Sequence, residues 1–133
     1  MIDSAVEHWY TAPAPASKDD LHRVLGDVIS SYQPHQAIMT AMADAATGSS
    51  ELARSFDLLM DRSTAALAAY IRRGQAEGFV CATVDPEPTG ALLAWMAEGG
   101  FRALLATDQP EGIDAIHRGL TDIYWRGLRM RAI

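Results

Sequence analysis

The stretch ELARSFDLLMDRSTAALAAYIRRGQAEGFV, residues 51–80, decides the fold class. Its apolar side chains recur every three or four residues, which is the spacing of one face of an α-helix. Ser49 or Ser50 can cap the start of this helix, and Gly78 can end it. At 1.5 Å per residue such a helix would extend roughly 40 Å. The sequence therefore predicts a helical protein organised around one long helix.

Boundary signals place shorter helices on both sides of the long one. Ser17 and Asp20 are spaced like a capping box, and Pro34 suits the first turn of a helix. Pro86, which follows an aspartate, is a second signal of this kind. Since no segment indicates a strand, we expect an all-α bundle of about six helices in a single domain, residues 1–133. The shorter helices are expected at residues 2–10, 17–32, 34–46, 86–106 and 112–131.

Composition excludes several classes of function. The chain has 133 residues, a formal net charge of −6, and no lysine and arginine cluster of the kind that neutralises nucleic-acid phosphates. Its densest basic segment, Arg126, Arg129 and Arg131, is interpreted as the positively charged end of the last helix. No apolar run approaches the roughly 20 residues that span a bilayer, and the single Cys81 cannot form an internal disulfide. We therefore expect a cytoplasmic protein that does not insert into a membrane.

Patterns for catalysis and metal binding are weak. His8, His22, His35 and His117 are scattered, without the helical pairing that a metal site needs. Cys81 has no neighbouring histidine or basic residue and follows apolar residues, which indicates a buried, unreactive thiol. The sequence contains no nucleophile elbow, phosphate-binding loop or dinucleotide-binding fingerprint. We therefore predict no enzyme activity, no metal and no cofactor.

The unusual feature is the number of large, adaptable side chains spread over several helices. Methionines and aromatic residues at helical spacing most often form core, and that interpretation stays open for each of them. A domain of this size that also places His35, Ser63 and Glu98 among them could instead enclose an apolar ligand pocket. The candidate pocket residues, among which Trp95 and Met96 are the strongest, are Trp9, Tyr32, Met39, Met42, Phe56, Met60, Ser63, Tyr70, Trp95 and Met96.

Several segments together resemble the C-terminal ligand-binding and dimerisation domain of TetR-family transcriptional repressors. They are VISSYQPHQAIMTAMADAA, the long stretch at residues 51–80, VDPEPTGALLAWMAEGGFRALLA and GIDAIHRGLTDIYWRGL, and they cover nearly the whole chain. The more specific signals are the I-x-x-G-x-x-x-G end of the long helix, the Asp-Pro step into the next helix and the run IYWRGL.

This resemblance implies an architecture and a set of partners. The first four helices and part of the fifth would enclose a pocket for a small, largely apolar effector. The last two helices, residues 86–131, would pair with those of a second subunit to form a homodimer. Family members also carry an N-terminal helix-turn-helix domain, to which nothing in these 133 residues corresponds. Residues 1–12 would then be the remnant of the connecting helix, and DNA would be bound only through a domain outside this sequence.

The segment ALLAWMAEGGFRALLA, residues 91–106, carries two consecutive glycines, and each costs about 1 kcal/mol inside a helix relative to alanine. Small residues therefore occupy the middle of this helix, and the last helix also carries glycines. We expect them to let helices approach closely in a dimer. Tight packing within one chain, or a kink at the glycine pair, is the alternative. The candidate interface residues are Leu93, Ala97, Gly100, Leu104, Ile116, Gly119, Ile123 and Gly127.

Taken with the resemblance, these features lead us to expect the effector-sensing, homodimerising domain of a TetR-type repressor. The alternative is a stand-alone helical dimer that binds a ligand or a protein partner and has no role at DNA. An in-frame helix-turn-helix upstream would favour the first, and its absence the second. Glu98 and Arg102, four residues apart, are expected to form a surface ion pair.

Overall fold

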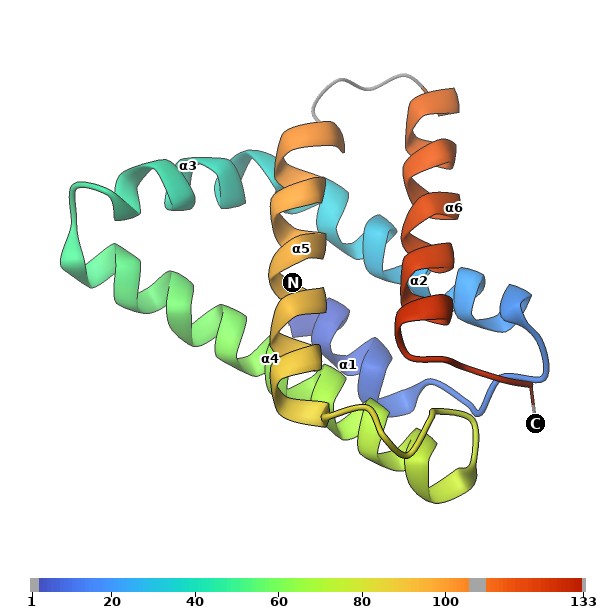
Figure 1. The fold of residues 1–133 in the computed structure, drawn as a ribbon. Coiled ribbons are helices and arrows are strands. Elements are labelled where there is room, and N and C mark those ends of the chain that lie inside the picture. The colour runs from blue at the N-terminus through green and yellow to red at the C-terminus, as the bar shows by residue number, and fades with distance from the viewer. Residues whose placement is uncertain (1–2, 106–109, 133) are drawn as a thin grey trace.

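The computed structural model describes residues 3–105 and 110–132. Within these residues all regular structure is helical and no strand occurs (Figure 1), which confirms the all-α prediction. The elements are α1 (Asp3–Thr11), α2 (Lys18–Tyr32), the short 3-10 helix η1 (Gln33–His35), α3 (Gln36–Ala46), α4 (Ser50–Glu77), α5 (Pro86–Leu104) and α6 (Pro110–Gly127).

The long helix α4 is defined by signals at both of its ends. The Oγ atom of Ser49 accepts a hydrogen bond from the backbone N–H of Leu52 at 3.3 Å. At the other end Gly78 adopts a left-handed φ of 91°, and its N–H donates to the carbonyl of Gly74 at 2.8 Å. Glycine takes this conformation without the steric cost that other residues meet. Both boundaries that the sequence predicted for this helix are confirmed.

The other glycine of this motif, Gly74, meets a different requirement. Beyond the helix end the chain folds back over α4, and the N–H groups of Phe79 and Val80 also donate to the Gly74 carbonyl. A Cβ atom at position 74 would lie 2.3 Å from Cγ2 of Val80 and 2.8 Å from Cε1 of Phe79. The I-x-x-G-x-x-x-G motif therefore combines space for the returning chain with a left-handed helix end.

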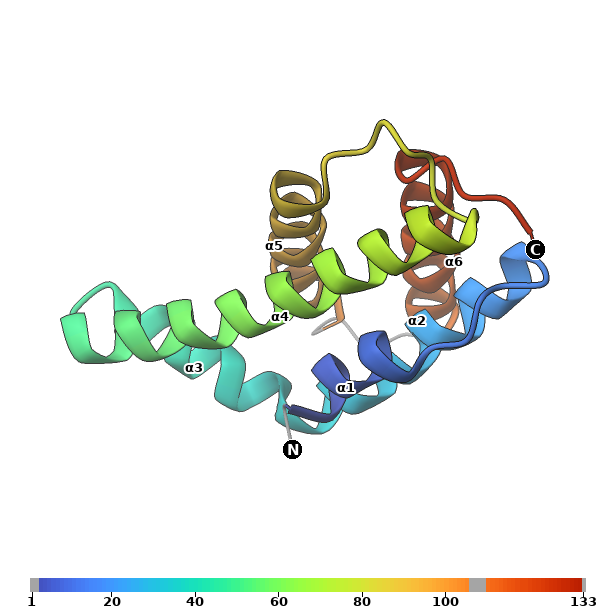
Figure 2. The ribbon, with the colours of Figure 1, turned by 90° about the horizontal axis from the view of Figure 1, so that it is seen from below.

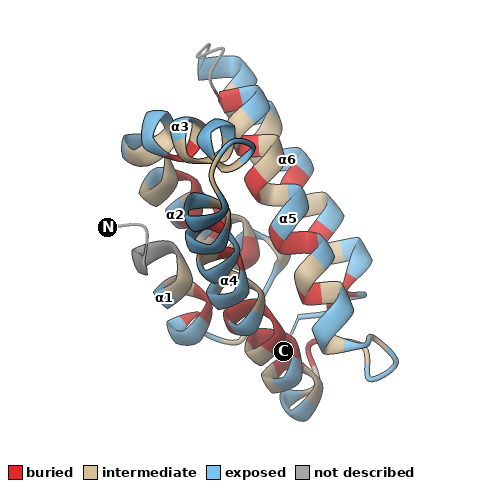
Figure 3. Cartoon of the chain, turned by 90° about the vertical axis from the view of Figure 1, so that its left-hand side faces the viewer, coloured by how far each residue is buried: buried red, intermediate tan, exposed pale blue. Residues whose placement is uncertain are grey.

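The remaining helices are arranged around α4. α1 lies between α2 and α4, while α3 runs back along α4 to form a hairpin that projects from the rest of the molecule (Figure 1, Figure 2). α5 crosses α4. α6 lies beside α5 and packs on α2. Figure 3 shows buried positions on the inward faces of the helices and exposed positions along their outward faces.

Three aromatic side chains from different helices form the centre of the core. Trp9 of α1 stacks on Tyr124 of α6 with ring centroids 5.7 Å apart, and it contacts Tyr70 of α4 at 5.1 Å. The hydroxyl of Tyr124 donates to the carbonyl of Leu93 in α5 at 3.1 Å. Aromatic side chains bury large apolar areas, so this contact stabilises the point where four helices meet.

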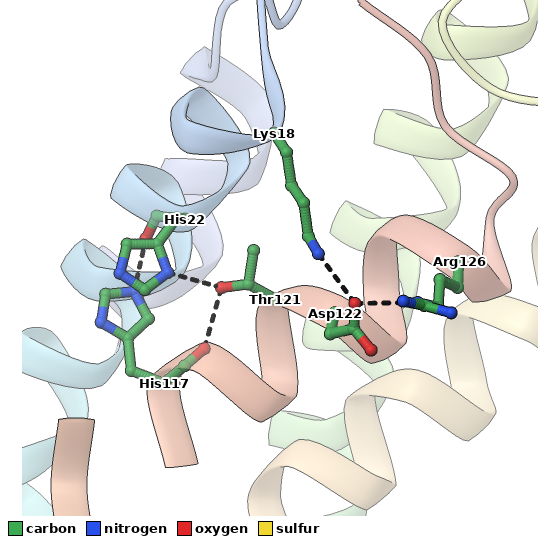
Figure 4. A network of polar contacts seen from close by, with 6 residues as sticks. All are labelled: Lys18, His22, His117, Thr121, Asp122 and Arg126. Atoms are coloured by element: carbon green, nitrogen blue, oxygen red, sulfur yellow. Dashed lines mark hydrogen bonds and ion pairs between the residues drawn. The ribbon is translucent and has the colours of Figure 1, made fainter. Parts of the chain in front are cut away.

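Polar side chains fix the junction between α2 and α6 (Figure 4). The rings of His22 and His117 stack with centroids 3.5 Å apart and planes 6° from parallel. A hydrogen bond of 3.0 Å joins His22 Nδ1 to Thr121 Oγ1, and the Thr121 hydroxyl donates to the carbonyl of His117 at 2.8 Å. A Cβ atom at Gly26 would lie 2.9 Å from Cε1 of His117, so the glycine makes room for the stacked ring.

An ion-pair network lies next to this histidine pair. Lys18 Nζ of α2 lies 2.7 Å from Oδ1 of Asp122 in α6, and Nε of Arg126 donates to the same oxygen at 2.8 Å (Figure 4). These hydrogen bonds, with Lys18 first, lower the pKa of Asp122 below its usual value. All three side chains are partly or largely exposed, so the network contributes more to the register of the two helices than to stability.

The end of the last helix differs from the prediction. α6 stops at Gly127 rather than at residue 131, and Arg129 has a φ of 48°. Beyond the helix, Arg131 makes two hydrogen bonds to the segment that follows α4. Its backbone N–H donates to the carbonyl of Phe79 at 3.1 Å, and its side-chain Nε donates to the carbonyl of Gly78 at 2.7 Å. If the helix continued, these hydrogen bonds to residues 78–85, the connector between α4 and α5, would be lost. The prediction that Arg129 and Arg131 belong to the helix end is therefore wrong.

The expected capping box at α2 is also absent in its usual form. Ser17 has the extended conformation of a cap residue, but its side chain makes no cap hydrogen bond. The carboxylate of Asp20 accepts instead from the N–H of Ala16 at 2.6 Å, one residue earlier than expected. This backbone bond is the main cause of the lowered pKa of Asp20.

Smaller differences affect the other helix boundaries. The first helix, α1, ends at Thr11 rather than at residue 10, and residue 2, its expected start, lies outside the described residues. α6 begins at Pro110 rather than at residue 112. Pro34 lies in η1, so α3 begins two residues later than expected. Residue 106, the expected end of the fifth helix, lies outside the described residues.

Candidate ligand cavity

An apolar cavity lies inside the bundle, beside the aromatic core. Its volume is about 80 Å³, and all six α-helices contribute side chains to its wall. Most of the wall is aliphatic or aromatic, with a small number of polar atoms among the apolar ones. Such a surface suits the binding of an apolar molecule better than it suits catalysis.

The polar atoms in the wall differ in whether they are already paired. The hydroxyl of Ser63 donates to the carbonyl of Leu59 at 3.3 Å, and that of Tyr124 is bonded as described above. The hydroxyl of Tyr32, by contrast, is buried and has no hydrogen-bond partner in the part of the chain that the structure describes. A buried hydroxyl without a partner costs free energy, so a bound molecule could gain by accepting a hydrogen bond from it.

Glu98 places a charged carboxylate in the cavity wall. Its side chain is 6% exposed, while Arg102, which donates to it from Nε at 3.1 Å and from Nη2 at 3.3 Å, is 35% exposed. The expected ion pair is therefore present, but the prediction that it lies on the surface is wrong for Glu98. This carboxylate faces the interior because Ala94, Ala97 and Phe101, which share its side of α5, pack inward.

The same environment acts on the neighbouring phenol. Burial first, and then the negative charge of Glu98, raise the pKa of Tyr32 to about 12, while the Arg102 charge acts in the opposite direction. The Tyr32 ring packs on Phe101 with centroids 5.1 Å apart. Tyr32 is therefore a neutral hydrogen-bond donor at physiological pH, held in place by an apolar contact.

The structure brings half of the predicted pocket residues to this cavity. Phe56 and Met42 belong instead to a second apolar cluster around Met60, and Tyr70 packs in the aromatic core. Trp95 lies over Phe56 with centroids 5.6 Å apart and is largely exposed, as is Met96. The predicted residues that line the cavity are Trp9, Tyr32, Met39, Met60 and Ser63.

Sequence reasoning missed several wall residues, both small and large, because an apolar pattern does not tell which face of a helix lines a cavity. On α5 the wall is built from positions 94, 97, 98 and 101, the spacing of one helical face, and two of these residues are alanines. The signal that could have found this face was the charged Glu98 inside that apolar pattern. The missed wall residues are Val6, Leu25, Val28, Leu59, Leu67, Ala94, Ala97, Phe101 and Tyr124, while Glu98 lies in the wall as one of the polar residues expected in a pocket.

The outer faces of α5 and α6 form an apolar surface, defined here by Leu92, Met96, Leu104 and Ile123. Leu92 is 73% exposed, Leu104 51% and Ile123 48%. Between the two helices lies an apolar groove of about 240 Å³. Exposed apolar surface of this kind marks interaction sites. The groove is lined by Met96, Ala97, Gly100, Phe101, Leu104, Ile116, Gly119, Leu120 and Ile123.

The predicted interface residues fall into two groups. Leu93 is buried in the core of its own chain and Gly127 is exposed outside the groove, whereas Ala97, Gly100, Leu104, Ile116, Gly119 and Ile123 line the groove. A Cβ atom at Gly99, Gly100, Gly119 or Gly127 would meet nothing within 4 Å. Close packing within the chain therefore does not explain these glycines.

Cys81 differs from the expected buried thiol. It is only partly buried, and its Sγ lies 3.1 Å from Oγ1 of Thr83. Hydrogen bonds from Thr83 lower the pKa of this thiol below its usual value. Among the described residues no group of three or more metal-ligating side chains gathers, and no described helix could cross a bilayer.

The fold and cavity define an all-α domain whose helices surround an apolar cavity, with two helices that expose a further apolar face. The family model "Transcriptional regulator EthR, C-terminal domain" matches residues 21–128, so the chain belongs to this family of TetR-type regulator domains. The match includes α2, η1, α3, α4, α5 and α6. No curated protein matches the chain significantly.

Proposed function

We propose that this chain is the effector-sensing and homodimerising domain of a TetR-type transcriptional repressor. The observation that carries the proposal is the cavity, whose apolar wall contains a buried hydroxyl without a hydrogen-bond partner among the described residues. A small, largely apolar effector would bind there. Residues 1–133 would act as one sensing domain, with residues 86–131 pairing across the dimer and residues 1–12 continuing toward the DNA-binding part.

The size of the cavity supports a mechanism in which binding changes the structure. Pockets for drug-sized ligands measure roughly 300–1,000 Å³, whereas this cavity holds about 80 Å³. An effector of that size would therefore displace side chains of the wall and, with them, the helices that carry these side chains. Trp9 of α1 and Tyr124 of α6 stack in the wall, so enlarging the cavity would separate α1 from α6. An effector that prefers the opened form would shift the population toward it.

This coupling would connect the cavity to DNA binding. α1 is the first described helix, and the family resemblance places the DNA-binding domain before it. The surface of α5 and α6 would hold two such chains together, so a shift of α1 would change the spacing of the paired DNA-binding domains. Regulation then requires only that the effector bind the two arrangements with different affinity.

The cavity is tested by filling it. Among the described residues the Ser63 hydroxyl hydrogen-bonds only within its own helix, so Ser63→Leu adds volume without breaking a hydrogen bond between helices. A probe such as hexan-1-ol, titrated by NMR, is expected to shift resonances of cavity residues in wild type and in Ser63→Ala, but not in Ser63→Leu. Equal binding to all three chains would contradict the proposed location.

The dimer is tested by sedimentation equilibrium of wild type, Gly100→Leu and Gly119→Leu, with circular dichroism to confirm folding. Each leucine would enter the groove, where the glycine Cβ position is open. We expect a wild-type dimer and folded monomeric variants. Ala41→Leu, on the exposed side of α3, is the matched control that should remain dimeric. A wild-type monomer at tens of micromolar would refute the homodimer.

A further inference from the structure

We infer that the cavity selects uncharged ligands that carry one hydrogen-bonding group, such as an amide or a hydroxyl, on an apolar body. The group would accept a hydrogen bond from the Tyr32 hydroxyl and lie against the Glu98 carboxylate. Ligands that end in a carboxylate would be rejected. This inference rests on the proposed function and specifies the chemical class of its effector.

The first argument concerns the acceptor. Ser63 and Tyr124 already donate to backbone carbonyls, so their protons are not available to a ligand. Tyr32 belongs to the cavity wall, and its hydroxyl is buried and has no hydrogen-bond partner among the described residues. A ligand oxygen placed beside it would satisfy this donor, whereas a purely apolar ligand would leave it unpaired.

The second argument concerns charge. Glu98 belongs to the cavity wall, while Arg102 reaches it from the more exposed side, where water can surround the guanidinium. A ligand inside the cavity would therefore meet the carboxylate first. A second carboxylate there would face a like charge in a poorly solvated space, and such pairs are unfavourable.

The third argument is that Glu98 can still accept a hydrogen bond. Two carboxylate oxygens offer about four acceptor positions, and Arg102 uses one on each oxygen. A ligand group that both accepts and donates could bond to Tyr32 and to Glu98. Amides and alcohols have this property, while ethers, halides and carboxylates do not.

The probes are four six-carbon compounds of similar size: hexanamide, hexan-1-ol, hexanoate and 1-chlorohexane. Dissociation constants are measured by ¹H–¹⁵N NMR titration of the whole chain at pH 7.5. We expect hexanamide and hexan-1-ol to bind at least about ten times more tightly than hexanoate. We also expect them to bind roughly three to ten times more tightly than 1-chlorohexane, the range of one neutral hydrogen bond.

Two variants separate the roles of the side chains. Tyr32→Phe keeps the ring contact with Phe101 and should reduce the advantage of hexanamide over 1-chlorohexane. Glu98→Gln should improve hexanoate binding while hexanamide still binds. Tyr10→Phe, which removes an exposed phenol from α1, is the control and should leave all four constants unchanged.

The outcomes distinguish the two proposals. Equal binding of hexanamide and 1-chlorohexane in wild type, or an unchanged preference in Tyr32→Phe, overturns the inference and leaves the cavity as an effector site. Hexanoate binding as tight as that of hexanamide also overturns it. If no probe binds wild type, the proposed ligand function is itself refuted, and the inference with it.

Discussion

Replacing Gly74 with alanine should destabilise the fold, although alanine is the better helix former. The substitution favours the helix by about 1 kcal/mol. Its Cβ, however, would lie under 3 Å from three side-chain atoms of Phe79 and Val80, and both residues are buried. Overpacking a well-filled core costs roughly 1–3 kcal/mol, and two crowded side chains place this site near the upper end. We expect a net loss of about 2 kcal/mol.

The same substitution at Gly99 provides the control. Gly99 lies inside α5, and a Cβ there would meet nothing within 4 Å. Only the helix-propensity gain of up to about 1 kcal/mol then applies. The two alanine variants should therefore differ by about 3 kcal/mol in the free energy of unfolding, with opposite signs relative to wild type.

Urea unfolding followed by circular dichroism measures both effects. At a slope of roughly 1–3 kcal/mol per molar urea, the two midpoints should be separated by at least about 1 M. Unchanged slopes would show that the denatured state is comparable in all three chains. A Gly74→Ala midpoint equal to or above that of wild type would refute the packing argument for this glycine.

Three further predictions concern side chains that are buried or whose pKa is shifted. Burial first, then the His117 charge and that of Arg118, lower the pKa of His22 against the effects of Asp114 and Asp19. The unfolded chain therefore takes up this proton more readily, so unfolding free energy should fall as pH drops below about 6.5. His22→Gln should reduce that loss in urea titrations at pH 7.5 and 5.5, and an identical loss would refute the assignment. Tyr124→Phe should cost about 0.5–1.5 kcal/mol by removing the buried hydrogen bond to the Leu93 carbonyl, while Tyr32→Phe, whose hydroxyl has no described partner, should be neutral or stabilising. Thermal unfolding of both variants checks this contrast, and equal losses would contradict it. Arg102→Met should destabilise by about 1–3 kcal/mol because Glu98 loses its partner, and adding Glu98→Gln should recover part of the loss; strictly additive effects in this double-mutant cycle would count against coupling.

Local chemistry explains why the long helix could be predicted from sequence. The cap at Ser49 and the left-handed Gly78 depend on residues within four positions of each helix end. The apolar face between them also has a simple period. Such signals can be recognised without knowing what the helix packs against.

The wall of the cavity could not be predicted with the same accuracy, because it depends on how helices cross. Trp95 and Met96 are larger than Ala94 and Ala97, yet α5 turns the alanines inward. Small residues are what permit a cavity where α5 crosses α4. A single sequence indicates that α5 has an apolar face but does not give the rotation of the helix about its axis.

Contacts between distant positions were likewise beyond the sequence pattern. His22 and His117 looked isolated because they are 95 positions apart, yet their rings stack. The turn after α6 was missed for a different reason: Arg129 adopts a positive φ that arginine rarely takes. Residues on either side of Arg129 form backbone hydrogen bonds with the connector between α4 and α5. No local sequence pattern indicates that these bonds form.

The hydrogen bonds of Thr121 decide where protons sit in the stacked histidine pair. A hydroxyl carries one hydrogen, and Thr121 gives it to the His117 carbonyl, so its contact with His22 requires a proton on Nδ1 of that ring. His117 must carry its own proton on Nε2, which meets the carbonyl of His22. Each imidazole is thereby fixed in a different tautomer. The nitrogens left to accept an added proton are Nε2 of His22 and Nδ1 of His117, and imidazole ¹⁵N chemical shifts would identify which of them is protonated first.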